Sequence, residues 1–208
     1  MVKIAVLVSG GGTNLQAILD SMLFGEIKNC ELKAVISSSP KAYALTRAQN
    51  AGIPHYVVDK KNYPNRRTFT DAIVDMLTDM DIELVVLAGF IYILTSRFTT
   101  VFEGKIINIH PSLIPSFCGE GYYGIHVHEK VLEYGVKLTG ATAQFVSKDT
   151  DAGPIILQRA VEVKQDDTPL TLQRRVMEEA EWKILPQAIS LFCEGRLKIE
   201  GRIVKILD

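Results

Sequence analysis

The chain has 208 residues, of which 47% are hydrophobic, and it carries a formal net charge of −1 at pH 7. This length suits one domain, and the balanced charge gives no reason to expect nucleic acid or another strongly charged macromolecule as a partner. The three cysteines lack the spacing of metal ligands, so we expect a reduced, cytoplasmic protein without a metal site.

Short apolar runs alternate with longer amphipathic stretches in the first part of the chain. Strands are predicted at 2–8, 31–37, 54–58, 83–88 and 105–109, and helices at 13–22, 41–51, 66–80 and 95–101. Continuous apolar strands separated by helices are typical of an α/β fold of the Rossmann-like, doubly wound kind, with a mostly parallel sheet and helices on both faces. Glycines end the first apolar run too early for a signal peptide or a membrane span, so no membrane partner is expected.

The pattern changes after residue 110. The predicted elements are a long loop at 118–124, a helix at 126–135, long strands at 139–146 and 154–163, a helix at 169–190 opened by Pro169, and a ribbon at 197–206 turning at Glu200 and Gly201. We expect one domain, 1–208, whose halves 1–100 and 101–208 share a sheet. The first half has the order of a nucleotide-binding unit, and the second adds longer strands and a long helix.

A glycine loop, SGGGTN at 9–14, separates the first strand from the first helix. Glycines there let backbone N–H groups approach an anion, and the helix N-terminus favours negative charge. The GxGxxG pattern and the P-loop pattern are both absent, so a phosphate monoester fits better than a dinucleotide or a nucleoside triphosphate. Thr13 or Asn14 is expected to cap the helix and to contact the phosphate. The alternative is a tight strand–helix turn without a ligand.

Two polar side chains lie at the carboxyl end of the strand predicted at 105–109. Asn108 and His110 are two residues apart and therefore face the same way. Two such donors suit an oxygen that gains negative charge, and histidine also moves protons near neutral pH. The alternative is a histidine satisfied by backbone at the end of a strand. Asp149 and Asp151, in SKDTDAG, are either turn residues or a carboxylate partner for His110.

Six segments together resemble one enzyme family over nearly the whole chain. They are SGGGTNL (9–15), VVLAGFIYIL (85–94), NIHPSLIPSF (108–117), HVH (126–128), DAGPIILQ (151–158) and EWKILP (181–186). The chain is similar to the phosphoribosylglycinamide formyltransferases, single-domain folate-dependent enzymes of purine synthesis. The resemblance implies transfer of a formyl group from 10-formyltetrahydrofolate to the amine of 5'-phosphoribosylglycinamide. A formyltetrahydrofolate deformylase of the same wider group, which releases formate, is the alternative.

The resemblance also implies roles for particular residues. Asn108, His110 and Asp151 are implied to be catalytic. Ribonucleotide binding is implied for Gly12, Thr13, Asn14 and Glu181, and folate binding for Arg66, Ile91, Tyr92, Ile93, Leu94, Ser147, Lys148, Asp149 and Thr150. No metal and no tightly bound cofactor are implied, because the folate is a cosubstrate. The expected partners are these small molecules, and the protein is expected to be a monomer or homodimer.

Three positions depart from the family pattern, and other functions need features that the chain lacks. Tyr92 stands where an arginine is common, Gln144 stands where a histidine is common, and the loop 118–124 is longer. A dinucleotide oxidoreductase would need GxGxxG and an acidic residue after the second strand, which ends in ISSSP. A regulator that only binds ligands would explain the glycine loop but not the three catalytic residues. His126 aligns with a position near the family's site, or is a polar residue at a helix start.

Overall fold

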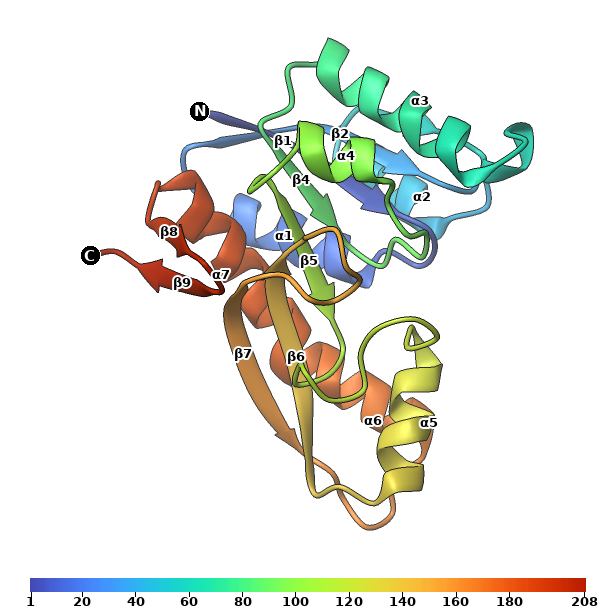
Figure 1. Ribbon diagram of the computed structural model, residues 1–208, viewed down its shortest axis with the longest axis vertical. Coiled ribbons are helices and arrows are strands. Elements are labelled where there is room, and N and C mark those ends of the chain that lie inside the picture. Colours follow the sequence, from blue (N-terminus) through green and yellow to red (C-terminus); the bar gives the residue numbers. More distant parts are fainter.

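The computed structural model describes residues 1–208, which form a nine-stranded mixed sheet flanked by helices (Figure 1). The strands are β1 (Val2–Val8), β2 (Cys30–Ser37), β3 (His55–Val57), β4 (Leu84–Leu87), β5 (Ile106–His110), β6 (Leu138–Phe145), β7 (Ile155–Glu162), β8 (Leu197–Glu200) and β9 (Ile203–Ile206). The helices are α1 (Thr13–Leu23), α2 (Tyr43–Asn50), η1 (Lys60–Asn62), α3 (Arg66–Asp79), α4 (Ser96–Val101), α5 (Ile125–Tyr134), α6 (Pro169–Val176), η2 (Met177–Glu181) and α7 (Trp182–Cys193). The sheet order is β3-β2-β1-β4-β5-β6-β7-β9-β8.

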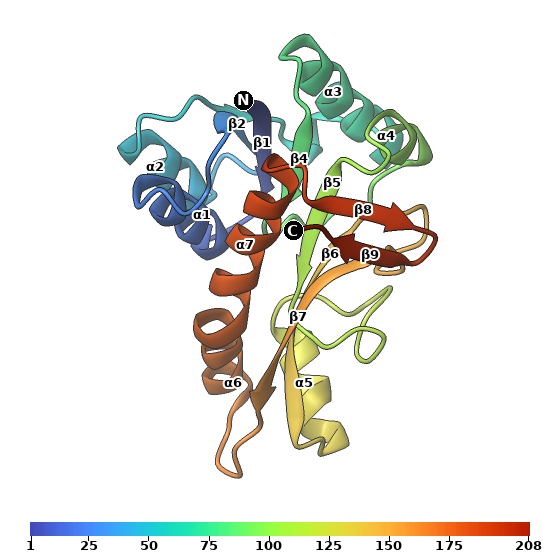
Figure 2. The same ribbon diagram turned by 90° about the vertical axis from the view of Figure 1, so that its left-hand side faces the viewer.

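The central strands are apolar throughout because both faces of the sheet are covered. In β1, Ile4, Val6 and Val8 belong to one buried cluster, whereas Ala5 and Leu7 belong to another. Successive side chains of a strand point to opposite faces, so the two clusters are the two sides of the sheet. Helices α1, α2 and α7 cover one face, and α3 and α4 cover the other (Figure 2). The predicted doubly wound α/β fold is confirmed.

The sheet changes direction at β5. β3, β2, β1, β4 and β5 pair in parallel, but β5 with β6 and β6 with β7 are antiparallel. The two long strands β6 and β7 extend away from the parallel part and are flanked by α5 and α6 (Figure 1). The predicted second part, with its longer strands, is therefore present within the same sheet.

Two predicted elements differ from the structure. The strand expected at 54–58 is only His55–Val57, and all three residues are exposed because β3 is the edge of the sheet. The single helix expected at 169–190 is α6, a π-helical turn η2, and α7, which continues to Cys193. Such π-helical turns occur inside α-helices, frequently at functional sites, and hydrophobic periodicity does not reveal them.

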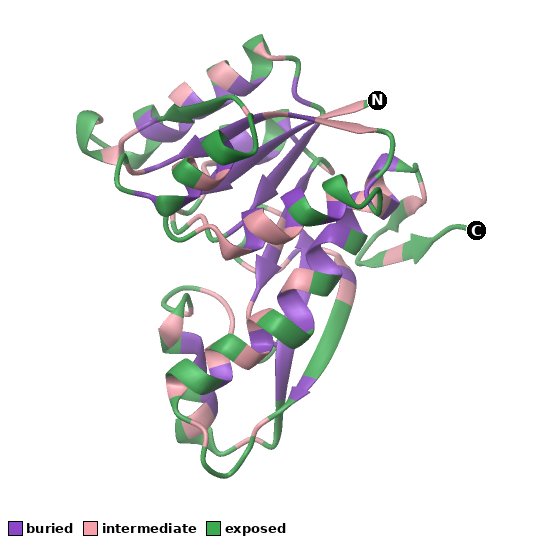
Figure 3. Cartoon of the chain, turned by 180° about the vertical axis from the view of Figure 1, so that it is seen from behind, coloured by how far each residue is buried: buried purple, intermediate pink, exposed green.

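Burial follows this arrangement. The buried residues concentrate on the central strands and on the helix faces turned toward them, whereas the β8–β9 ribbon is mostly exposed (Figure 3). The ribbon joins the sheet through one pair, Ile155 with Ile203, and turns after Glu200 as expected. None of the helices has the length and apolar character needed to cross a membrane.

Candidate functional site

A cavity of about 730 Å³ lies at the carboxyl ends of β1, β4 and β5. In open α/β sheets ligands bind at this edge. The cavity is lined by the glycine loop, by the segment after β4, by the end of β5, by the loop before α5, by the turn after β6 and by residues of α6 and η2. It therefore joins segments from both parts of the chain in one space.

The glycine loop presents free backbone donors to this cavity. None of the N–H groups of Gly10, Gly11 and Gly12 donates a hydrogen bond within the chain. Gly12 is the residue before α1 and has φ 72°, and a Cβ there would lie 2.6 Å from the Cβ of Ala44. Only glycine fits, both because of the positive φ and because of this contact. The expected cap by Thr13 or Asn14 is wrong, because no side chain caps α1 and Gly12 holds that position.

Asn14 instead points toward η2. Its Nδ2 donates to Oε2 of Glu181 at 2.6 Å, both side chains are buried, and the Asn14 Oδ1 has no partner. Burial raises the pKa of Glu181 to about 7, and the hydrogen bond from Asn14 only partly offsets that rise. Thr13 contacts the sulfur of Met177 at 3.6 Å. The structure thus brings together all four residues predicted to bind the ribonucleotide.

The predicted pairing of His110 with an aspartate is present. Nδ1 of His110 lies 3.5 Å from Oδ2 of Asp151, and both side chains are less than a tenth exposed. The backbone of Asp151 has φ 52°, in the left-handed region. Asp149 is exposed and contributes only a backbone carbonyl, which accepts from Ser147 Oγ at 3.1 Å. The choice between the two aspartates left open by the sequence is settled for Asp151.

His110 is also bonded to the backbone, as the alternative interpretation of a histidine at a strand end expected. Its Nε2 lies 2.9 Å from the backbone oxygen of Phe117, and since a carbonyl only accepts, Nε2 carries the proton. Gly119 N–H donates to Oδ2 of Asp151 at 2.9 Å. The loop before α5 therefore holds both members of the pair. Of the two side chains expected to donate, Asn108 and His110, only Asn108 is free. It is half-buried and makes no side-chain hydrogen bond within the chain.

Most of the residues predicted to bind folate line the same cavity. They are Ile91, Tyr92, Ile93, Leu94, Ser147, Lys148 and Thr150. Tyr92 packs edge-on against Phe69, with 5.0 Å between ring centroids, so an aromatic ring stands where the family pattern has a cation. Among the lining residues, Lys148 is the only lysine or arginine. The N–H of Ile91 donates to Ser9 Oγ at 3.2 Å, which ties this segment to the glycine loop.

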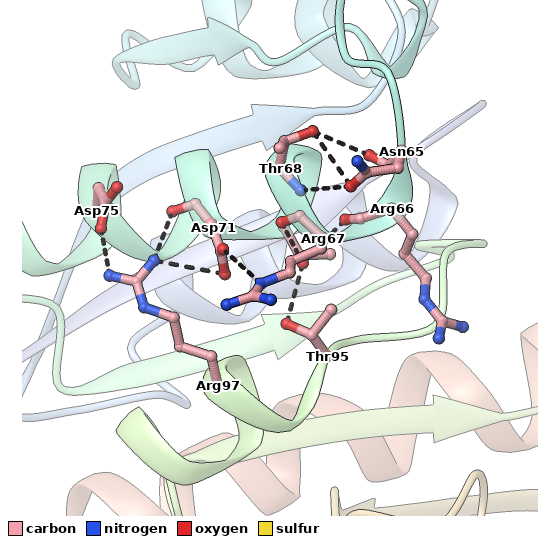
Figure 4. A network of polar contacts seen from close by, with 9 residues as sticks. Asn65, Arg66, Arg67, Thr68, Asp71, Asp75, Thr95 and Arg97 are labelled. Atoms are coloured by element: carbon pink, nitrogen blue, oxygen red, sulfur yellow. Dashed lines mark hydrogen bonds and ion pairs between the residues drawn. The ribbon is translucent and has the colours of Figure 1, made fainter.

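Two predicted folate residues, Asp149 and Arg66, do not line the cavity. Arg66 is the first residue of α3, is exposed and forms no ion pair. Figure 4 shows its side chain extending away from the neighbouring network, in which Arg97 is paired with Asp71 and Asp75. The structure therefore does not bring Arg66 together with the other site residues.

His128 is a cavity residue to which the sequence analysis gave no role. His128 is fully buried, lines the cavity, and has no hydrogen-bond partner at either ring nitrogen. Burial, and secondly the charge of His110, lowers its pKa to about 4. His126, which aligns with a position near the family's site, is an exposed residue at the helix start and bonds Glu129 at 2.8 Å. The helical period was the available signal, because His128 lies one turn from the buried Val131.

Cys118 is poorly placed to act as a nucleophile beside His110. Its thiol donates to the Pro115 carbonyl at 3.3 Å, and it does not line the cavity. Burial, and secondly the charge of Asp151, raises the pKa of this thiol. A reactive cysteine needs the thiolate form, which these surroundings disfavour.

Comparison with known proteins places this geometry in a family. Residues 2–189 match the family model described as formyl transferase. A phosphoribosylglycinamide formyltransferase of Haemophilus influenzae is 41% identical over 203 residues, which cover 98% of this chain and 92% of that protein. The crystal structure of glycinamide ribonucleotide transformylase 1 from Symbiobacterium toebii is 46% identical, with a TM-score of 0.94 over 100% of this chain and 95% of that one.

Other similarities are partial. The trifunctional purine biosynthetic protein adenosine-3 of Gallus gallus is 44% identical over 198 residues, which are 95% of this chain but 19% of that protein. The chain thus spans about a fifth of the length of such relatives. A formyltetrahydrofolate deformylase from Pseudomonas syringae is 24% identical, with a TM-score of 0.89 over 100% of this chain and 66% of that one. This last likeness shows a shared fold alone.

Proposed function

The chain belongs to the formyl transferase family, and from that premise we propose that it transfers the formyl group of 10-formyltetrahydrofolate to the amine of 5'-phosphoribosylglycinamide. The products would be formylglycinamide ribonucleotide and tetrahydrofolate, in de novo purine (IMP) biosynthesis. One observation carries the proposal: the His110–Asp151 pair and the free amide of Asn108 face the cavity that also receives the glycine loop. A phosphorylated amine and a formyl donor can therefore meet there.

The ribonucleotide occupies the side of the cavity formed by α1 and η2. Its phosphate accepts hydrogen bonds from the free N–H groups of the glycine loop, where the N-terminus of α1 adds a favourable dipole. Thr13 and Asn14 lie in the first turn of that helix, and Glu181 supplies carboxylate oxygens for hydroxyl or amine donors of the substrate. His110 lines the same cavity, so the substrate amine can reach it from this side.

The folate occupies the opposite side. The apolar segment of Ile91, Ile93 and Leu94 packs against its flat pterin ring, and the turn of Ser147, Lys148 and Thr150 closes over it. Lys148 meets the anionic end of the folate, since no other lysine or arginine lines the cavity. The folate is a cosubstrate and leaves after each turnover.

The chemistry follows from the charge that develops on the formyl oxygen. The substrate amine attacks the formyl carbon, and the carbonyl oxygen becomes negatively charged in a tetrahedral intermediate. Asn108 Nδ2 and protonated His110 donate hydrogen bonds to that oxygen. At His110 Nε2, the formyl oxygen replaces the Phe117 carbonyl as the acceptor. Asp151 supports the positive charge of His110 and accepts the amine proton through water. When the intermediate collapses, the bond between the formyl carbon and N10 breaks and N10 takes up that proton.

The test is the conversion of 10-formyltetrahydrofolate by the purified protein, with and without 5'-phosphoribosylglycinamide. Turnover only when the ribonucleotide is present, with formylglycinamide ribonucleotide as product, is the expected result. Turnover without it, releasing formate, would identify a deformylase. No turnover in either reaction would refute the proposal.

A further inference from the structure

Gln144 lies between the residues that the proposed mechanism uses. It is on β6, is 1% exposed, and stands directly opposite Asn108 of β5 in the antiparallel register. Side chains of directly opposed residues lie on the same face of a sheet, close enough to contact each other. On its other side, Gln144 Nε2 donates to Oδ1 of Asp151 at 3.2 Å.

The amide of Gln144 is only half satisfied. A carboxylate only accepts hydrogen bonds, so the contact with Asp151 fixes the amide nitrogen of Gln144 on that side and its oxygen on the other. That oxygen, Oε1, is buried and has no partner. A buried acceptor without a donor is destabilising, and such groups in native proteins need an explanation.

Local backbone geometry supports a specific placement of this side chain. The pairing of β6 with β7 shifts register between Ala143 and Gln144, so that Ile156 has no partner. Bulges of this kind re-aim side chains beside active sites. The donor that faces Gln144 from β5 is the amide of Asn108, which makes no side-chain hydrogen bond within the chain.

We propose that Gln144 is a positioning residue, which orients the carboxylate of Asp151 through Nε2 and the amide of Asn108 through Oε1. The inference rests on the proposed function. In the substrate complex, Asn108 donates one Nδ2 proton to Gln144 and the other to the formyl oxygen. The opposite orientation of Asn108 would place two carbonyl oxygens together, so Gln144 selects the orientation that presents a donor to the developing charge.

The first experiment is steady-state kinetics of Gln144→Met, which keeps the length of the side chain and removes both polar atoms. We expect kcat to fall about 10- to 100-fold, the range seen when a hydrogen-bond partner that orients a metal ligand is lost, while KM for the ribonucleotide changes less than about threefold. Gln158→Met is the matched control. Gln158 is on β7, donates to the Ile114 carbonyl and to Thr142 Oγ1, and lies outside the cavity. Its replacement should lower stability and leave kcat within about threefold.

A double-mutant cycle separates positioning from general structural support. If Gln144 acts through Asn108, the loss caused by Gln144→Met should largely disappear when Asn108→Ala is already present. Gln144→His tests the bond to Asp151, because a ring N–H can replace the amide donor. That variant should recover activity to within about tenfold of the parent and should add a pH dependence near pH 6.5, the ordinary pKa of histidine.

Three results would overturn the inference. They are a Gln144→Met variant as active as the Gln158 control, additive losses in the double variant, and a histidine variant no better than methionine. If the methionine variant fails to fold, the histidine variant and its pH profile decide the question. An inactive parent protein would refute the proposed function together with this inference, whereas an active parent with an active Gln144→Met would refute this inference alone.

Discussion

The buried carboxyl group of Glu181 makes stability depend on pH in a direction that one substitution can isolate. Its pKa rises from the ordinary 4.5 to about 7 because the group is buried. The folded protein therefore binds this proton more tightly than the unfolded chain does. The stabilisation is fully present below about pH 4.5 and is lost as the pH rises through about 7. At about 1.4 kcal/mol per pKa unit, the loss is about 3 kcal/mol.

Glu181→Gln should remove this pH dependence. A neutral amide at position 181 can accept from Asn14 Nδ2, and its own N–H groups can reach the Asn14 Oδ1 that now lacks a partner. We expect the variant to be more stable than the parent by up to about 3 kcal/mol at about pH 8.5. Near pH 5 the two should agree within about 1 kcal/mol, since the parent then holds its proton.

The assay is urea unfolding followed by circular dichroism at both pH values. Glu179→Gln is the control, because Glu179 belongs to the same turn η2 but is exposed. A Glu181→Gln variant that is less stable than the parent at about pH 8.5, or that differs from it equally at both pH values, would refute the reasoning. The same variant should bind the ribonucleotide more weakly, since stabilising changes at ligand sites often cost function.

Three further substitutions test separate parts of the site. Asn108→Ala should lower kcat by a factor on the order of 10²–10³ with ribonucleotide KM nearly unchanged; a parallel rise in KM would contradict a donor role. The Cβ added by Gly12→Ala would lie 2.6 Å from the Cβ of Ala44, on a backbone with φ 72°. The loop must therefore shift, and the KM for the ribonucleotide should rise more than about tenfold while the KM for folate stays unchanged. The pKa of His128 is lowered to about 4, so the unfolded chain binds this proton more tightly than the folded protein does. The folded protein therefore loses stability as the pH falls from about 6.5 through 4. His128→Leu should reduce that loss by up to about 3 kcal/mol, measured by urea unfolding at about pH 7 and 4.5.

The parts of the fold that could be predicted are those fixed by local pattern. A continuous apolar run such as β1 fits only a strand covered on both faces, and alternation of such runs with helices fixes the layers. His128 could also have been found, because helical periodicity places it inward, beside Val131. The motif segments then located most of the cavity lining, because the residues that shape it are contiguous in the chain.

The parts that could not be predicted depend on contacts between distant residues. Asn14 bonds Glu181 across 167 positions, and the π-helical turn that carries Glu181 leaves no mark in hydrophobic periodicity. The engagement of His110 by the Phe117 carbonyl depends on a φ of 51° at Phe117, which no residue preference at a non-glycine position indicates. Arg66 is likewise absent from the cavity lining, because the position of the first turn of α3 relative to the cavity depends on tertiary packing.

The change of strand direction at β5 explains why the candidate site needs the second part of the chain. In a parallel sheet, only the loops after the carboxyl ends reach the ligand edge, and these supply the glycine loop and the segment after β4. An antiparallel β6 adds a side chain from within the strand, Gln144, directly opposite Asn108. The turn that follows then returns Asp151 to His110. The glycine loop and Asp151 therefore reach the cavity from opposite sides of β5, and neither part of the sheet lines the cavity alone.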